Sequence, residues 1–363
     1  MKILHIVEDF SLLSGGLRTV IKDLDFELCS DNNKSKILSS KKEESDSIYI
    51  VGTNNPWLYS SKWIPKLLAL QAKYSFDVFH IHGVWTFPQY ITAKFCIKKN
   101  IPFIISTHGM YEPWLWKKGA FKKKLYFNLL AKNVFKKASF IHAITEGEKN
   151  NLQKLFKQNT IVEIPNLIKT IDFSENIPTG IQEKYILYLG RLDKKKGIDI
   201  LINAFAKISD KKVKLKIAGK KNNYKKELDV LIKKNNLTKR VIFSGLVKND
   251  IKERLIKEAF VLVAPSHSEV IGMVNLEAAI FKTPVITTFQ TGINIKWNLN
   301  GGRLINPNQN ELINALNEVL KWSDKEREIN GEKLYKFVVD NYSWEGKFSD
   351  WIKLYKSAKK FIK

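Results

Sequence analysis

The sequence predicts an α/β protein built from two Rossmann-like domains that face each other across a cleft. Short apolar runs typical of β-strands alternate with longer amphipathic segments, which is the pattern of parallel sheets covered by helices on both faces. The alternation occurs in two series, separated by a polar stretch that contains Pro165, Pro178 and Gly180. The length of 363 residues agrees with this division, since about 150 residues per domain is usual.

The first series should form a domain of residues 1–170. Strands are expected at residues 3–7, 47–51, 78–82, 103–107, 140–144 and 161–164. Residues 30–47 are rich in Lys, Ser, Asn and Glu, and we interpret them as a solvated loop.

The second series should form a domain of residues 171–345. Strands are expected at residues 185–189, 214–218, 241–244, 259–264 and 284–287, and helices at 198–208, 224–235 and 312–322. A last helical pattern, residues 344–362, has no strand after it. We therefore expect residues 346–363 to pack back on the first domain.

The charge balance narrows the class of protein. An excess of 61 basic over 36 acidic residues gives a net charge of +25, which predicts attraction to nucleic acid, an anionic membrane face or a phosphorylated substrate. Cys29 and Cys96 cannot form a disulfide framework, and the six His residues show no zinc spacing. No apolar run approaches the roughly 18 residues of a membrane helix, and the apolar start is too short for a signal peptide. A soluble cytoplasmic protein is expected.

The most informative loop follows the strand that ends at Ala264. Glu269 lies in this loop, a helix begins near Met273, and Glu277 lies about one turn into that helix. The free backbone N–H groups of a helix start favour an anion. Two carboxylates beside them suit a ligand with hydroxyls at both ends and negative charge in the middle, as in a nucleotide sugar. The alternative is a capped surface helix with two solvated glutamates.

A basic loop follows the strand at residues 185–189. Arg191 comes directly after Gly190 at the strand end, and Lys196 precedes the next helix. At the mouth of a cleft, Arg offers phosphate oxygens a planar fork and Lys a point charge. We interpret the neighbouring Lys194 and Lys195 as solvated side chains.

Together these motifs resemble the retaining glycosyltransferases of family four, the glycogen-synthase-like class with the GT-B fold. The resemblance rests on two glutamates with seven residues between them in SHSEVIGMVNLEAAIFKTPVI, on the loop GRLDKKKG, and on Ser14-Gly15-Gly16 after the first strand. It covers almost the whole chain. Val270-Ile271-Gly272 replaces the commoner Gly-Phe-Gly, and Ala218-Gly219-Lys220-Lys221 replaces a Gly-rich turn, so contacts to the sugar and the base are expected to differ.

The resemblance implies a role for individual residues. Glu277 would bind the ribose hydroxyls, and Glu269 would lie beside the donor sugar. His108 would face that sugar near the reacting centre; a neutral, buried structural histidine is the alternative for this residue. Arg191 and Lys196 would neutralise the leaving diphosphate. His82 is as consistent with a structural role as with a site role. The implied catalytic set is Glu269, Arg191, Lys196 and His108, and the implied donor-binding set is Gly15, Gly16, Gly190, Ile271, Gly272, Met273, Val274 and Glu277.

The implied reaction transfers a hexosyl group from a nucleotide diphosphate to a hydroxyl with retention at the anomeric carbon. A UDP-sugar is favoured as donor, bound by the second domain. The acceptor, bound by the first, would be a lipid-linked saccharide of bacterial O-antigen (lipopolysaccharide) or capsule, because residues 107–114 and the helix after them resemble surface-polysaccharide transferases. No Asp-x-Asp cluster follows a strand, so the two cations should replace Mg²⁺, and neither a metal nor a cofactor is expected.

Two rival functions remain open at the level of sequence. A glycosidase would use the two glutamates about 5–10 Å apart across one bond, whereas the resemblance places them at opposite ends of a donor. A nucleic-acid-binding protein would explain the charge, but the lysines are spread over both domains without a recognised binding motif. Nucleic acid is therefore not expected as a partner.

A basic segment in the first domain predicts contact with an anionic membrane surface. Residues 117–137 contain eight Lys and no acidic residue, interleaved with apolar side chains at helical spacing. Each Lys near an anionic surface contributes about 1 kcal/mol, and Trp favours the interface. We expect peripheral attachment to the inner face of the cytoplasmic membrane; packing of the apolar positions on the first domain is the alternative. The residues expected at the membrane are Trp114, Trp116, Lys117, Lys118, Lys122, Lys123 and Lys124.

Overall fold

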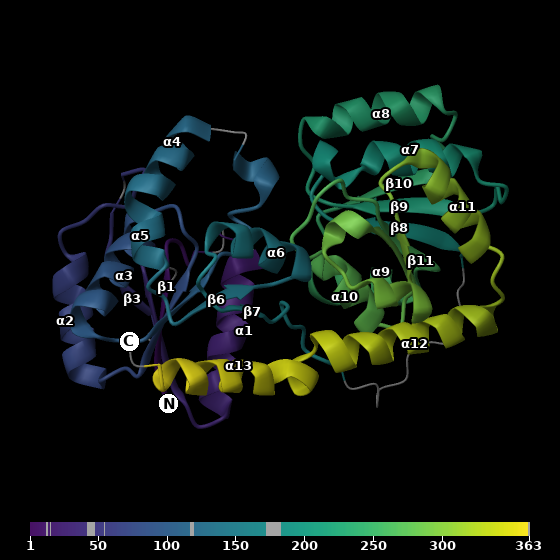
Figure 1. Ribbon diagram of the computed structural model, residues 1–363. Coiled ribbons are helices and arrows are strands. Elements are labelled where there is room, and N and C mark those ends of the chain that lie inside the picture. The colour runs from purple at the N-terminus through teal and green to yellow at the C-terminus, as the bar shows by residue number, and fades with distance from the viewer. Residues whose placement is uncertain are drawn as a thin grey trace. The chain divides into compact units, whose positions relative to one another are not determined.

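The computed structural model describes residues 1–11, 14, 16–41, 48–53, 55–116, 120–171 and 183–361. It divides into two compact units, Met1–Asn166 with Phe348–Lys363, and Leu167–Lys347 (Figure 1). The fold is α/β, with one parallel sheet in each unit. None of the helices in the described residues is long and apolar enough to cross a membrane.

The first unit contains a seven-stranded sheet in the order β3-β2-β1-β4-β5-β6-β7. Every strand pair in it is parallel. The strands are β1 (Lys2–Val7), β2 (Lys34–Ser39), β3 (Ile48–Ile50), β4 (Val78–His82), β5 (Phe103–Ser106), β6 (Phe140–Ala143) and β7 (Ile161–Glu163). The helices are α1 (Gly16–Ser30), α2 (Trp63–Tyr74), α3 (Phe87–Lys99), α4 (Ala120–Tyr126), α5 (Lys132–Phe135), α6 (Glu146–Leu155) and α13 (Trp344–Lys359), with a 3₁₀ turn η2 (Pro113–Trp116) and a π-helical turn η3 (Phe127–Ala131).

The prediction of a solvated loop at residues 30–47 is wrong in part. Residues 34–39 form β2, which pairs along its whole length with β1 and buries Ile37, Leu38 and Ser39. The segment carries two lysines and two serines among six residues, so its apolar pattern is too weak to predict a strand. Its burial comes from the neighbouring β1 and not from its own composition.

Alternation along the strands gives the two faces of this sheet different characters. Leu4, Ile6, Phe79 and Ile81 belong to the large apolar core that also includes residues of α2, α3 and α5. Because successive strand residues point to opposite faces, the intervening His5, His80 and His82 lie on the other face. There Tyr355 of α13 contacts His80.

The second unit contains a six-stranded parallel sheet in the order β10-β9-β8-β11-β12-β13. The strands are β8 (Tyr185–Leu189), β9 (Lys214–Ala218), β10 (Val241–Gly245), β11 (Val261–Ala264), β12 (Val285–Thr288) and β13 (Arg303–Ile305). The main helices are α7 (Ile198–Lys207), α8 (Tyr224–Lys234), α9 (Asn249–Glu258), α10 (Met273–Ile280), α11 (Gln309–Val319) and α12 (Asp324–Tyr342), with 3₁₀ turns η4 (Lys194–Lys196), η5 (Phe289–Thr291) and η6 (Ile295–Leu299).

Helices cover both faces of this second sheet. Helix α7 packs against α8 and α11, while α10 packs against α12, and Figure 1 shows the two sets on opposite faces. The strand order reverses between β8 and β11, which lie side by side although the chain visits β9 and β10 between them. Such a reversal opens a crevice at the carboxyl ends of the strands, where open α/β sheets bind ligands.

Candidate active site

The loop after β8 is held by a capped turn and a glycine. Asp193 accepts a hydrogen bond from the Lys195 backbone N–H at 2.9 Å, which caps η4. Gly197 follows with φ +66°, and a Cβ there would lie 2.1 Å from the carbonyl oxygen of Pro265. Only glycine allows this approach, so the loop after β8 packs directly against the loop after β11. This contact brings Lys196 to the second loop.

Lys196 and Glu269 form an ion pair between these two loops. Their side chains are only 20% and 16% exposed. Glu269 also accepts a hydrogen bond from Ser266 Oγ at 3.3 Å, and its backbone N–H donates to the Gln290 carbonyl at 2.9 Å. The position of the carboxylate is therefore set by several contacts, and the sequence alone gave no sign that its partner is Lys196.

The pair lies in a pocket of about 230 Å³ at the crevice between β8 and β11. Helix α10 begins there at Met273, and no side chain caps its first turn. Its free backbone N–H groups and the Lys196 ammonium make the pocket suited to an anion. The lining residues are Tyr188, Leu189, Gly190, Lys196, Ala264, Ser266, Glu269, Ile271, Gly272, Met273, Val274, Asn275 and Thr291.

Asn275 is a pocket residue that the sequence did not single out. The Thr287 hydroxyl donates to the Ala264 carbonyl at 3.0 Å, so it can only accept from the Asn275 amide N–H, at 3.2 Å. This fixes the orientation of the amide and leaves Asn275 Oδ1 buried, with no hydrogen-bond partner in the described part of the chain. A buried, unpaired acceptor of this kind suits a ligand hydroxyl.

Glu277 and Arg191 do not line this pocket. Glu277 lies further along α10, where it forms a 2.8 Å ion pair with Lys252 of α9. Arg191 is exposed at the end of β8, and its carbonyl accepts a hydrogen bond from Tyr188 at 2.8 Å. Each predicted glutamate thus has its own cationic partner, and Lys252 is a second residue that sequence reasoning missed.

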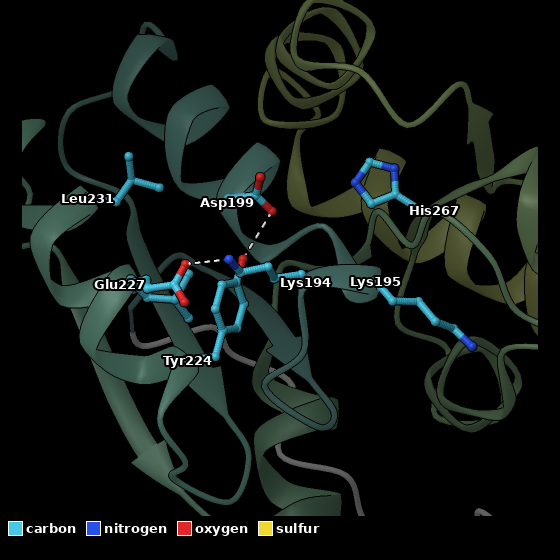
Figure 2. A pocket seen from close by; sticks show the side chains of 8 residues that line it. Lys194, Lys195, Asp199, Tyr224, Glu227, Leu231 and His267 are labelled. Atoms are coloured by element: carbon cyan, nitrogen blue, oxygen red, sulfur yellow. Dashed lines mark hydrogen bonds and ion pairs between the residues drawn. The ribbon is translucent and has the colours of Figure 1, made fainter. Parts of the chain in front are cut away.

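A larger pocket of about 510 Å³ opens on the other side of η4 (Figure 2). The Lys194 ammonium pairs with Glu227 at 2.7 Å, and the Tyr224 hydroxyl donates to Asp199 at 3.3 Å. Both Lys194 and Glu227 are mostly exposed. The charges of Lys194 and Glu227 are thus compensated within the pocket.

In the first unit, His108 follows β5 in a loop that a buried carboxylate holds. Its backbone is left-handed, with φ +50°. On either side of it, the Thr107 hydroxyl and the Gly109 N–H both donate to Glu148, the latter at 2.6 Å, and the Ile144 N–H donates to the same carboxylate at 2.8 Å. Burial raises the pKa of Glu148, while these three hydrogen bonds lower it, with a net rise.

The His108 ring is neutral and belongs to a hydrogen-bonded cluster. Burial lowers the pKa of His108 to about 3. Its Nε2 atom lies 2.9 Å from His82 Nδ1, so the second expected histidine is a neighbour of the first. Of the two glycines of the first domain in the implied donor-binding set, Gly16 begins α1, where an added Cβ would meet nothing within 4 Å, and Gly15 lies outside the described residues.

Three buried histidines, His5, His80 and His82, have ring nitrogens within 4.8 Å of one another, a spacing that a metal ion could use. Both His80 nitrogens, however, already have hydrogen-bond partners, Tyr355 at 2.7 Å and Ser106 at 2.6 Å. The nitrogens that join His5 to His82 also face each other at 2.9 Å. These ring nitrogens, which a metal ion would need as ligands, therefore already take part in hydrogen bonds.

The residues expected at a membrane surface separate into two groups. Trp116 donates to the Tyr111 carbonyl at 3.0 Å and packs against Trp85 and Phe127, so it belongs to the interior of the unit. Lys123 donates to the Leu115 carbonyl at 2.7 Å. Lys122 and Lys124 are described on α4. Lys117, Lys118 and the side chain of Trp114 lie outside the described residues.

Two parallel α/β units, one with a pocket at its strand reversal that suits an anion, are typical of GT-B glycosyltransferases. The glycosyl transferases group 1 model matches residues 168–337, and the glycosyltransferase family 4 model matches residues 14–171. Together the two matches cover residues 14–337, and the chain belongs to the group 1 glycosyltransferases with the GT-B fold.

Individual relatives agree with this placement. An uncharacterized glycosyltransferase of Methanocaldococcus jannaschii is 34% identical over 52% of this chain, a match that spans about half of that relative's length (48%). A 41.2 kDa protein from the cps region of Klebsiella pneumoniae is 26% identical over 79% of this chain and 80% of its own. The structure of Anabaena HepE in complex with UDP and glucose superposes with a TM-score of 0.73 at 17% identity, covering 98% of this chain and all of the other.

Proposed function

We propose that this chain transfers a hexosyl group from a nucleotide diphosphate, with a UDP-sugar favoured, to a saccharide hydroxyl with retention at the anomeric carbon. The observation that carries the proposal is the pocket between β8 and β11. It combines an uncapped helix start, a half-buried ammonium, a carboxylate and an unpaired amide acceptor. This set complements a diphosphate attached to a sugar.

The chain's own groups would act mainly by electrostatic stabilisation. As the bond between the anomeric carbon and the diphosphate oxygen breaks, negative charge grows on the diphosphate. Lys196, Arg191 and the N-terminus of α10 would stabilise that charge. A bound diphosphate would compete with Glu269 for the Lys196 ammonium and would leave Glu269 free to accept a hydrogen bond from a sugar hydroxyl.

The ion pairs favour a transferase over a glycosidase. A hydrolase needs two carboxyl groups that act on one bond. Here Glu269 is paired with Lys196 and Glu277 with Lys252. Glu269 is also the one carboxylate among the described residues that line the pocket. Because the Lys196 ammonium already pairs with this carboxylate, it would oppose a second cation there, and this supports metal-independent transfer.

The acceptor we propose is a lipid-linked saccharide of a bacterial surface polysaccharide, O-antigen or capsule. The support is the similarity to the Klebsiella pneumoniae protein from the cps region, together with the basic segment of the first unit.

That segment supports peripheral attachment at the inner face of the cytoplasmic membrane through α4 and η3. Phe121, Leu125 and Leu129 are 79%, 49% and 65% exposed and lie four residues apart, on one face of the helical segment. Lys122 and Lys124 lie among them. An exposed apolar row flanked by lysines is typical of helices that lie in the membrane interface. The apolar anchors we propose are thus these three residues, in place of Trp116.

A thermal-shift screen across UDP- and GDP-sugars tests the donor assignment. A cognate donor at 100 times its Kd should stabilise the protein by about 2.7 kcal/mol. The product formed from that donor should carry the donor's anomeric configuration by NMR, with or without EDTA. Absence of any shift, an inverted product, or loss of activity in EDTA that Mg²⁺ restores would each contradict the corresponding part of the proposal.

A further inference from the structure

Five of the six histidines gather in the first unit because of strand alternation and register. His5 pairs with His80 across β1 and β4, His82 pairs with Ser106 across β4 and β5, and Ser106 pairs with His142 across β5 and β6. Their side chains share one face of the sheet, and His108 follows in the loop after β5. The resemblance implies a role near the donor sugar for His108 alone, so the other four buried imidazoles need an explanation.

One branch of the cluster has a fixed direction of hydrogen bonding. His142 Nε2 lies 2.7 Å from the Ile164 carbonyl, which can only accept, so His142 carries its proton on Nε2. Ser106 must then donate to His142 Nδ1 and accept from His80 Nε2, at 2.7 and 2.6 Å. His80 Nδ1 is left to accept from the Tyr355 hydroxyl at 2.7 Å. His80 and His142 are therefore both Nε2–H tautomers.

The second branch is a chain of three imidazoles, His5–His82–His108. His5 Nδ1 lies 2.9 Å from His82 Nε2, and His82 Nδ1 lies 2.9 Å from His108 Nε2. Both pairs of ring centroids are 5.2 Å apart, with interplanar angles of 28° and 27°. At that separation nearly parallel rings meet edge to edge, which aligns each N–H with the lone pair of the next ring. Neutral rings in such a chain must all donate in the same direction.

The buried end of the chain indicates that direction. His5 Nε2 is fully buried, and no described residue forms a hydrogen bond with it. If the N–H groups donated in the direction from His108 to His5, the proton of His5 would lie on Nε2, which would then be a buried donor without an acceptor. If they donate in the direction from His5 to His108, His5 Nε2 is instead a buried acceptor without a donor. Orphaned buried N–H groups are the rarer of the two in proteins. The second direction places the His108 proton on Nδ1.

We propose that His5 and His82 are positioning residues that hold His108 as its Nδ1–H tautomer, so that it offers a hydrogen-bond donor to an oxygen of the substrate. His108 is partly exposed, and the described residues supply no partner for its Nδ1 atom. The Glu148 carboxylate holds the loop on both sides of the ring. The arrangement selects the tautomer that is the minor one for histidine in water.

The test is the ¹⁵N NMR spectrum of the ligand-free protein labelled at histidine. Nδ1–H and Nε2–H tautomers have distinct ring ¹⁵N shifts. We expect Nδ1–H for His5, His82 and His108, and Nε2–H for His80 and His142, which serve as internal references. A His108 signal of the Nε2–H type in the wild-type protein overturns the proposal, whether or not any variant folds.

A variant tests whether His82 imposes the tautomer. His82→Ala leaves room for water beside His108 Nε2, so the His108 signal should move toward the Nε2–H form while His80 and His142 keep theirs. An unchanged His108 signal in the folded variant would show that His82 does not act on it.

Kinetics test the consequence for transfer, and this part rests on the proposed function. The Asn amide can place an N–H near the Nδ1 position of histidine, and the Gln amide near Nε2. His108→Asn should therefore retain about tenfold more kcat than His108→Gln, the effect of one hydrogen bond. The reverse order would contradict the donor role. The NMR experiment needs no substrate, so a wrong donor assignment leaves its result interpretable.

Discussion

Lys196 and Glu269, which lie 73 residues apart in the sequence, form an ion pair across the carboxyl ends of β8 and β11. The two strands are neighbours in the sheet, and Gly197 allows their loops to touch. The pair therefore joins the two sequence motifs, the basic loop and the glutamate loop, into one pocket.

Neutralising either member of the pair should reduce transfer. We expect Lys196→Gln to lower kcat by roughly 10²-fold or more, since it removes a charge that stabilises the leaving diphosphate. Glu269→Gln should also lower kcat while leaving the affinity for free UDP nearly unchanged. Lys194→Gln is the matched control, because Lys194 pairs with Glu227 on the surface. Steady-state kinetics would contradict this prediction if the control lost as much activity as Lys196→Gln.

Glu277 should contribute mainly to nucleotide binding. Glu277→Ala removes a charged acceptor for ribose hydroxyls, and UDP affinity measured by calorimetry should fall by about 1.5–3 kcal/mol. Lys252→Ala should have a smaller effect, because it removes only the partner of that carboxylate. Glu258→Ala, which breaks an exposed pair with Arg254, is the control. If Glu269→Ala weakens UDP binding and Glu277→Ala does not, the two roles are reversed.

The buried histidines should make the protein sensitive to acid. Burial lowers the pKa of His5 and His108 to about 3 and that of His142 to about 4, and it lowers the pKa values of His80 and His82 as well. Between pH 6.5 and about 4 the unfolded chain takes up protons that the native chain does not. As the pH is lowered through this range, the free energy of unfolding should fall by about 1.4 kcal/mol per pH unit for each of His5, His108 and His142.

Urea titrations at several pH values measure this slope. His267→Gln, which changes the one histidine outside the cluster, should leave the slope unchanged. A free energy of unfolding that stays constant from pH 6.5 to 5 would show that the native histidines take up protons as those of the unfolded chain do, which contradicts the prediction.

Attachment to anionic vesicles should depend on the exposed row of α4 and η3. Replacing Lys122 and Lys124 by Gln should weaken the free energy of binding to anionic vesicles, measured by sedimentation, by about 2 kcal/mol. Binding should also fall as the salt concentration rises. Phe121→Ser with Leu125→Ser should weaken it at any salt. Changing Lys117, Lys118, Lys122, Lys123 and Lys124 together to Gln should abolish it and spare transfer to a soluble acceptor.

The controls for attachment are on the same unit. Lys98→Gln with Lys99→Gln changes two exposed lysines at the end of α3 and should have little effect. Equal binding to neutral vesicles would exclude an electrostatic contribution from the segment.

The α/β class, two of the site loops and most strands follow from the amino-acid sequence alone. β4, β8 and β9 have the predicted ends, because the apolar residues that each strand buries are close together in the sequence and are bounded by residues of another pattern. Helix α10 begins at Met273, as predicted. The glutamate and lysine loops follow strand ends, so their place at one edge of the sheet could be inferred from the alternation of strand and helix patterns along the sequence.

Which side chains come into contact depends on the tertiary fold and could not be predicted from the sequence. β2 and β13 are buried by neighbouring strands and carry too little apolar pattern, or too few residues, to be recognised locally. Trp116 faces inward because an aromatic cluster surrounds it. The histidines look scattered along the chain, yet strand register places five of them in one hydrogen-bonded cluster. Strand order and the pairing of particular residues across strands depend on contacts between distant parts of the chain, which the local pattern does not specify by itself.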